Sequence, residues 1–117
     1  MTNPFLHGID LFNQAKFFDA HEALEDVWRA APAPEKKFYQ GLIQAAVAFH
    51  HHSTGNHRGM RSVLERSIKN LTHAPENFPQ HNAGVHLPPL LHSLSAWRDA
   101  VDHHHPPPPL PRITLKR

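Results

Sequence analysis

The stretch from Leu42 to Phe49, LIQAAVAF, decides the fold of this chain. Gln44 is its only polar residue, so a helix with about 100° between successive residues is apolar nearly all round here. Such a helix belongs at the centre of a helical domain, because each of its faces has to be covered by apolar neighbours. We therefore expect a buried central helix over about residues 34–53.

Proline and glycine residues divide the rest of the chain into further segments. Pro32 and Pro34 separate the central helix from a first helical segment, about residues 3–30, which should break near Ala15. Gly55 and Asn56 end the central helix, because both residues tolerate the left-handed conformation found at helix ends. The remaining segments are a helix at about 57–71, a loop at 72–86, a helix at about 87–102 and an extended tail.

These segments predict an all-α protein, a single compact up-and-down helical bundle of four to five helices. We expect the bundle domain to cover residues 1–102. Residues 103–117 should form an extended Pro-rich C-terminal tail, because the run of prolines favours the polyproline conformation. Ile113 and Leu115, near the end of this tail, are expected to dock on the bundle.

Composition narrows the class of protein. The chain has no cysteine, which excludes a disulfide scaffold, a thiolate zinc site and a cysteine nucleophile. No secretory signal and no membrane-spanning run is visible, so we expect a cytoplasmic protein without a membrane partner. A net charge of +2 is a slight basic bias, which makes a nucleic-acid partner improbable. Thirteen histidines include the runs 50–52 and 103–105, which could hold adventitious nickel or zinc.

The run HEALEDVW, residues 21–28, places polar groups where a helix should be apolar. With His21 at zero on a helical wheel, Trp28 falls at about −20° and Glu25 at about +40°. His21 and Glu25 therefore lie inside the apolar stripe, between aromatic side chains. A buried carboxylate needs a hydrogen-bonding partner, a metal or a shifted pKa. We expect both side chains to face the protein interior.

The central helix carries a matching polar row. Gln40, Gln44 and His51 fall within about 40° of one another on the helical wheel. An antiparallel pairing of the first and second helical segments would bring this row to His21 and Glu25. We predict one buried polar cluster, with Trp28 in the adjoining core and Asn56 as a helix cap beside it. Its members are His21, Glu25, Gln40, Gln44, His51, Trp28 and Asn56.

These residues carry a resemblance to a known family. The runs LFNQAKFFDAHEALEDVWR and FYQGLIQAAVAFHHHSTGNHRGM look like the small bacterial and archaeal family catalogued as domain of unknown function 309. The similarity covers roughly residues 11–71 and rests on a His-Glu-x-x-Glu-x-x-Trp pattern followed by Gln-Gly-Leu-Ile-Gln. It implies an all-helical bundle and no established reaction, although some members have been labelled metal-dependent hydrolases.

A metal site is one alternative interpretation of the cluster. Zinc proteases carry His-Glu-x-x-His on a helix, with the two histidines one turn apart as ligands. Here Glu25 takes the second position, so the ligands of a divalent transition metal (Zn, Fe or Ni) would be His21, Glu25 and His51, with Glu22 as the catalytic base. Two features oppose this site, because Glu22 points about 100° away from His21 and glutamine amides are poor zinc ligands.

Three functions therefore stay open. The first is an uncharacterised helical bundle, in which the polar cluster is structural and holds two helices in register. The second is a metal-dependent hydrolase that uses His21, Glu25 and His51. The third is a pocket for a small molecule or a partner. A homodimer is compatible with each of them.

Overall fold

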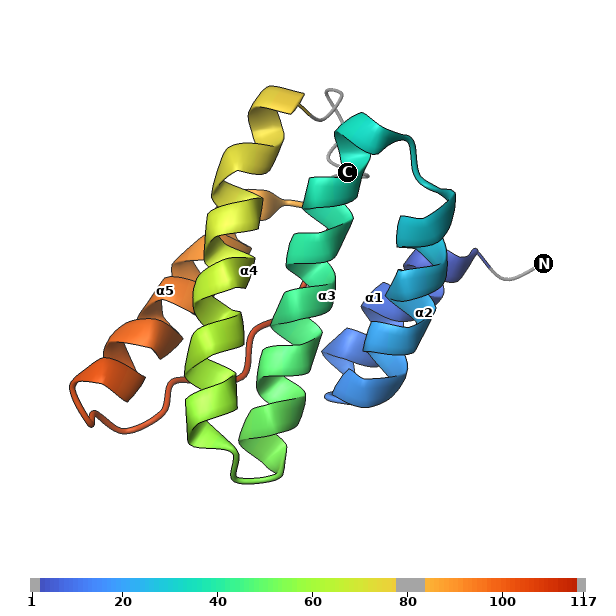
Figure 1. The fold of residues 1–117 in the computed structure, drawn as a ribbon. Helices are drawn as coiled ribbons and strands as arrows, with labels where there is room; N and C mark the ends of the chain where they lie inside the picture. The colour runs from blue at the N-terminus through green and yellow to red at the C-terminus, as the bar shows by residue number, and fades with distance from the viewer. Residues whose placement is uncertain (1–2, 78–83, 116–117) are drawn as a thin grey trace.

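The computed structural model describes residues 3–77 and 84–115, with the side chains of residues 75–77 left aside. The described residues form five helices in chain order. Figure 1 shows α3 at the centre with α2 and α4 on either side, α1 behind α2 and α5 beside α4. This arrangement confirms the all-α bundle. The helices are α1 (Pro4–Asn13), α2 (Phe17–Ala30), α3 (Ala33–Ser53), α4 (His57–Asn77) and α5 (Leu87–Asp102).

Helix α3 is the core of the bundle, as its apolar composition predicts. Phe38, Leu42 and Phe49 are each 0% exposed. The Phe49 ring lies 5.6 Å from the Phe17 ring of α2 and 5.1 Å from the Trp97 ring of α5, measured between centroids. The Phe49 side chain of α3 therefore contacts both α2 and α5.

The first helical segment breaks where the sequence predicts. Ala15 has a φ of 63°, a left-handed conformation that ends α1 and lets the chain turn back into α2. The amide of Lys16 then donates to the carbonyl of Leu11 over 2.9 Å. A Cβ on Gly8 would come within 2.8 Å of the Leu24 side chain, so α1 and α2 cross closely there.

The turn between α3 and α4 also follows the sequence. Gly55 has a φ of 80°, and the amide of Asn56 donates to the carbonyl of His51 over 2.9 Å. Asn56 then caps α4, because its side-chain oxygen accepts the amide of Gly59 over 3.0 Å.

The predicted end of the third bundle helix is wrong. We expected this helix to stop at Leu71 and residues 72–86 to form a loop, but α4 continues to Asn77. Leu71 and Ala74 are 0% and 2% exposed, so their burial against the core holds the additional turn in place. Of the predicted loop, residues 78–83 lie outside the described residues.

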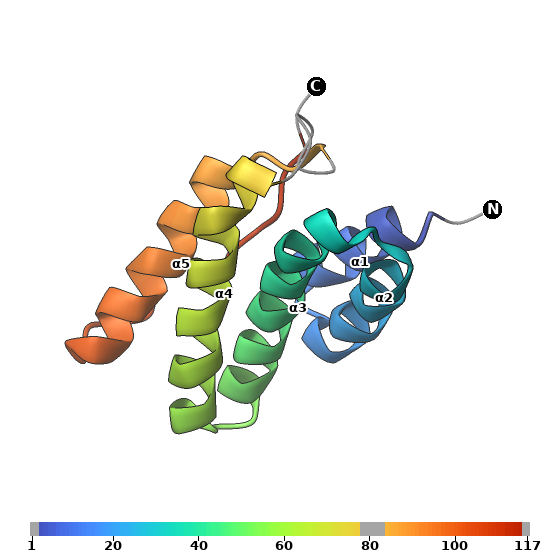
Figure 2. The same ribbon diagram turned by 45° about the horizontal axis from the view of Figure 1, so that its top comes forward.

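The C-terminal tail runs back along the bundle (Figure 2). Its backbone is bound there by the side chain of Asn13. The Asn13 side chain accepts the amide of Ile113 over 2.8 Å and donates to its carbonyl over 2.9 Å. Ile113 is 1% exposed, which confirms its predicted docking, whereas the Leu115 side chain is 41% exposed. Leu115 joins the fold through an isolated antiparallel bridge with Val85.

No helix among the described residues is long and apolar enough to cross a membrane.

Candidate functional site

The half-open seam between α2 and α3 contains the residues of the His-Glu-x-x-Glu pattern. Because the two helices are antiparallel, the first turn of α2 lies beside the last turns of α3. Phe17 is 6% exposed and packs on Phe49, whereas the next residue, Phe18, is 50% exposed. The Phe18 ring lies 5.7 Å from the ring of His21 and 5.3 Å from the ring of His50.

A hollow of about 160 Å³ lies in this seam. Two of its lining residues, Phe18 and His21, come from α2, and the other two, Val47 and His50, come from α3. We call this hollow the α2–α3 groove. Its lining is half aromatic or aliphatic and half imidazole, so it suits an apolar group with a polar rim.

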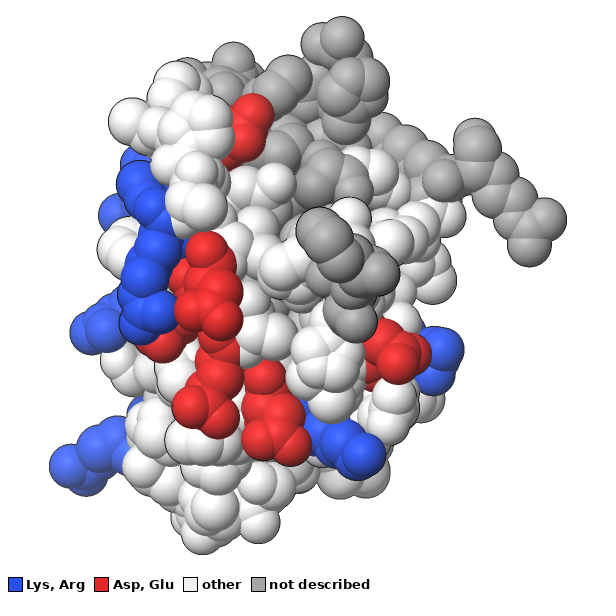
Figure 3. Space-filling model, turned by 90° about the vertical axis from the view of Figure 1, so that its right-hand side faces the viewer, with Lys and Arg blue, Asp and Glu red and all other residues white. Residues whose placement is uncertain are grey.

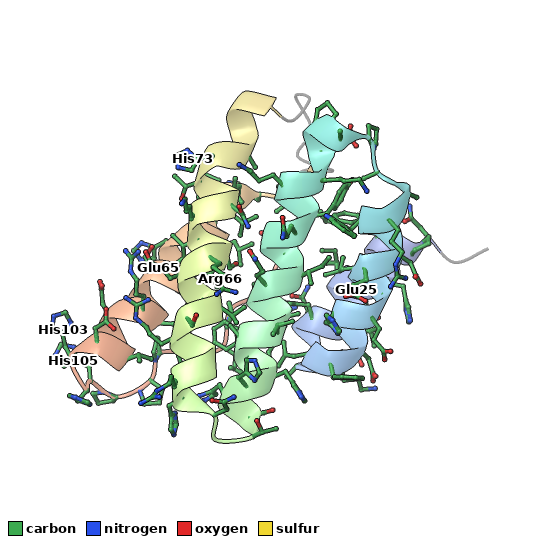
Figure 4. All side chains as sticks on the ribbon, viewed as in Figure 1. Glu25, Glu65, Arg66, His73, His103 and His105 are labelled. Atoms are coloured by element: carbon green, nitrogen blue, oxygen red, sulfur yellow. The ribbon has the colours of Figure 1, made fainter. Side chains whose placement is uncertain are left out.

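The His21–Glu25 pair lies at the edge of this groove and is partly solvated. His21 Nε2 is 3.2 Å from Glu25 Oε1, and the two side chains are 24% and 37% exposed. The other carboxylate oxygen lies 3.4 Å from Arg29 Nη2. Both partners of Glu25 therefore come from its own helix, one turn before it and one turn after it. Figure 4 shows Glu25 on α2.

The polar row of α3 does not meet this pair, which corrects the prediction of one buried cluster. Gln40 is exposed to solvent. Gln44 Oε1 accepts a hydrogen bond of 2.7 Å from Asn70 Nδ2, so it belongs to the seam with α4. His51 Nδ1 lies 3.4 Å from Asn56 Nδ2 at the end of the helix. The row points away from α2 because Val47 and His50 occupy the side of α3 that lines the groove.

The three predicted metal ligands are not assembled. Among the described residues, no three His, Cys, Asp or Glu side chains form a group that could hold a metal ion. His21 and Glu25 are adjacent, but His51 interacts with Asn56 in the turn. Glu22, the predicted base, is exposed. The residues present therefore do not fit the predicted site, and we derive no hydrolytic step from it.

Sequence reasoning missed three of the four residues that line the groove, Phe18, Val47 and His50. Phe18 is one of the aromatic side chains that flank His21 on the helical wheel, and His50 belongs to the histidine run 50–52. The sequence pattern gives neither residue a distinct role, because His51 and not His50 shares its phase with the glutamines. The available signal was Phe49: once its side chain is directed to the core, His50 is turned by about 100° toward α2.

Trp28 lies on the same helix, two turns beyond His21, and is partly buried. Lys36 Nζ lies 4.5 Å from its ring centroid and donates to its backbone carbonyl over 2.6 Å. The indole Nε1 of Trp28 is buried and has no hydrogen-bond partner among the described residues. Trp28 thus contacts α3 through its ring and its backbone carbonyl.

The outer face of α2 is acidic. Asp19, Glu22 and Asp26 are exposed on it, and Glu25 lies between them and the groove. Arg29 is the basic residue in the last turn, and its Nη1 lies 3.0 Å from Asp26 Oδ1. Figure 3 shows acidic side chains gathered on this side of the molecule. We call these exposed carboxylates the acidic ridge.

Comparison with known proteins assigns the sequence of this chain to a family. The model of the family DUF309, a domain of unknown function, matches residues 5–63. An uncharacterised protein of Aquifex aeolicus (strain VF5) is 38% identical over 74 residues, which are 62% of this chain and 22% of that protein. The uncharacterised protein YpuF of Bacillus subtilis (strain 168) is 38% identical over 54 residues, which are 45% of this chain and 31% of YpuF.

The chain thus spans between about a fifth and a third of the length of these relatives. No solved structure matches it. The matched residues 5–63 include α2, α3 and all of α1 except its first residue, and therefore the complete α2–α3 groove. This chain belongs to the DUF309 family.

Proposed function

We propose that this chain is a non-catalytic cytoplasmic binding module, whose α2–α3 groove takes an apolar side chain of a basic helical partner segment. The observation that carries the proposal is Phe18, an aromatic side chain that is 50% exposed directly beside a hollow. Burying the rest of this ring against a partner would contribute on the order of 1 kcal/mol. Aromatic anchors beside a small hollow are typical of the centre of a protein interface.

The charge on α2 supports a basic partner. Exposed carboxylates at Asp19, Glu22 and Asp26 lie along the helix that also provides Phe18. A partner helix with an apolar stripe would place a leucine or methionine in the groove and lysines against the acidic ridge. Such complementarity raises association rates and selects against acidic partners, including nucleic acid.

The lengths of the relatives support a module that is one part of a larger protein. The matched region makes up 22% of the Aquifex protein and 31% of YpuF. In both proteins, therefore, the part similar to this chain occurs together with a larger part that is not matched. A small bundle with an open groove is suited to contact such segments or separate chains.

A binding role also suits the chemistry of the groove better than hydrolysis does. Glu25 is already paired with His21 and Arg29, so its charge is balanced on its own helix. His21 and His50 line the groove, so their ring nitrogens are placed to hydrogen-bond to a partner. The predicted structural role was to hold α2 and α3 in register. The His21–Glu25 pair lies within α2 and does not join the two helices.

A peptide titration tests the proposal. The probe is an 18-residue amphipathic helix of leucine and lysine with a terminal fluorophore, and its anisotropy is measured as protein is added. We expect binding that Phe18→Ser weakens by about tenfold or more. Leu6→Ser is the matched control, because Leu6 is 47% exposed on α1, and it should leave binding unchanged.

A glutamate-for-lysine version of the peptide should bind at least about tenfold more weakly, since it faces the acidic ridge with like charge. Equal loss in the Phe18 and Leu6 variants would contradict the proposal. So would concentration-dependent dimerisation that Phe18→Ser abolishes without any peptide binding, because the groove would then serve a second copy of the chain.

A further inference from the structure

A larger hollow, of about 600 Å³, lies on the opposite side of the bundle from the acidic ridge. It is formed where the end of α3, the start of α4, the end of α5 and the following tail meet. Its floor includes Trp97 and Val101 from α5, and its walls include His52, His57, His104 and His105. We call it the histidine pocket. Its volume lies in the range of sites that hold small organic ligands, roughly 300–1,000 Å³.

The floor of the histidine pocket is fixed before any ligand arrives. Trp97 is 3% exposed, and its Nε1 donates to the carbonyl of Pro109 over 2.9 Å. The Trp97 ring is held between Phe49, 5.1 Å away, and His52, 5.0 Å away, between centroids. Because the tail is tied to the same indole, the walls and the floor form one preorganised unit.

The turn after α5 builds the second wall. His104 adopts a φ of 56°, a left-handed conformation that is uncommon outside glycine, asparagine, aspartate and histidine. His103 Nδ1 lies 2.9 Å from the carbonyl of Asp99, and the His103 and His105 rings stack at 5.7 Å between centroids. This turn holds His104 and His105 at the rim, whereas His73 lies far from them (Figure 4).

The described lining contains four histidines and no aspartate or glutamate. Asp102, at the end of α5, is bound by Arg61 through contacts of 2.6 and 3.0 Å. Imidazole N–H groups therefore meet no competing carboxylate in the lining and are available to an anionic acceptor. The apolar floor in turn suits a planar ring.

From this combination we propose that the histidine pocket binds a small aromatic carboxylate, with the ring over the floor formed by Trp97 and Val101 and the carboxylate toward the imidazoles. A metal ion is the weaker candidate, because no three His, Cys, Asp or Glu side chains of the described residues form a group that could hold one. The proposal does not depend on the α2–α3 groove, since the two hollows share no lining residue.

Calorimetric titration of the full chain, made without an affinity tag, tests this proposal with three probes. They are 1-naphthylacetate, its neutral analogue 1-naphthylacetamide and acetate. We expect 1-naphthylacetate to bind with a stoichiometry of one. The amide should bind about tenfold more weakly because it lacks the charge-assisted hydrogen bonds, and acetate should show no measurable binding because it lacks the ring.

The indole N–H signal of Trp97 in a proton–nitrogen NMR spectrum locates the site. Trp28→Phe leaves Trp97 as the only tryptophan of the chain, and it removes an indole N–H that forms no hydrogen bond among the described residues. The Trp97 signal should shift on addition of 1-naphthylacetate.

Two further variants test the walls and the volume. Replacing both His104 and His105 with alanine should weaken binding by about tenfold, whereas the same replacement of the exposed His73 and His92 should not. Val101→Trp should abolish binding by covering the floor on which the aromatic ring of the ligand would lie, with circular dichroism as the check on folding. Equal binding of acetate and 1-naphthylacetate, an unchanged affinity in the His104/His105 variant, or stoichiometric zinc binding without naphthylacetate binding would each overturn the proposal.

Discussion

The two seams of α3, with α4 and with α2, differ in how far their polar side chains are buried and hydrogen-bonded. On the side of α4 the helices approach closely, since a Cβ on Gly41 would come within 2.7 Å of Leu71. Ser67, which is 0% exposed, donates to the carbonyl of Gly41 over 2.7 Å, and Asn70 donates to Gln44. On the side of α2 the seam is half open, and His21 and Glu25 are 24% and 37% exposed.

This difference shows which polar groups hold helices together. Between α3 and α4, the hydrogen bond from Ser67 to Gly41 is buried, so water cannot replace it, and the bond from Asn70 to Gln44 is partly buried. The His21–Glu25 pair lies within one helix and faces solvent, so its net contribution to folding should be small. The α3–α4 seam thus stabilises the fold, whereas the seam that holds the α2–α3 groove remains partly open to solvent.

The largest expected effect comes from overpacking the seam between α3 and α4. Gly41→Ala should lower the free energy of unfolding by about 2 kcal/mol, because Leu71 is 0% exposed and cannot move aside. Urea denaturation measures it. Gly59→Ala is the control, since the three atoms nearest to its Cβ would all belong to the exposed side chain of Asn56, and it should change stability by less than about 1 kcal/mol. Equal losses at the two glycines would mean that the seam is not tight.

Ser67→Ala should come next, with a loss of about 1 kcal/mol, because it removes a buried hydrogen bond to Gly41. Ser53→Ala is the matched control. Its hydroxyl donates to the carbonyl of His50 over 2.6 Å, but at an exposed position, so we expect a loss below about 0.5 kcal/mol. Thermal and urea unfolding of both variants measure the contrast, and a larger effect at Ser53 would reverse the interpretation.

Glu25→Gln should have little effect on stability. The carboxylate is partly solvated and interacts only along its own helix, so we expect a change below about 0.5 kcal/mol. The measurement is urea denaturation at low and at high salt. A loss of more than about 2 kcal/mol would instead indicate a buried cluster that depends on this charge.

The smallest effect concerns the exposed seam between α4 and α5. Arg61 beside Asp102 holds the pKa of that carboxyl below its usual value. A carboxyl with a lowered pKa in the folded state stabilises the protein above its unfolded pKa, and this contribution is lost as the pH falls through the folded pKa. Asp102→Asn should therefore reduce the loss of melting temperature between about pH 4 and pH 2.

Melting curves from pH 7 to pH 2 measure this effect, with Asp19→Asn as a control that removes a carboxylate from the exposed face of α2. An identical acid dependence in the Asp102 variant and the unmodified protein would show that the ion pair with Arg61 does not contribute to stability.

Most of the fold follows from local sequence features. The breaks at Ala15 and Gly55 are confirmed by their positive φ values, and the capping role of Asn56 by its bond to Gly59. The extension of α4 beyond Leu71 could not be predicted, because the burial of Ala74 overrides the signals of a loop. Of the predicted cluster, His21 and Glu25 do lie together on one face of α2. The residues of α3 across from His21 are Val47 and His50, and not the row of Gln40, Gln44 and His51.

The sequence by itself determined the helices and the central place of α3, because helix periodicity, glycine, proline and capping residues act over a few neighbouring positions. Tertiary structure alone decided which side of α3 faces α2, since the rotation of one helix against another depends on packing throughout the core. Phe49, whose ring packs on those of Phe17 and Trp97, fixes the rotation of α3 about its axis. It directs His50 into one hollow and His52 into the other, and no local pattern specifies this choice.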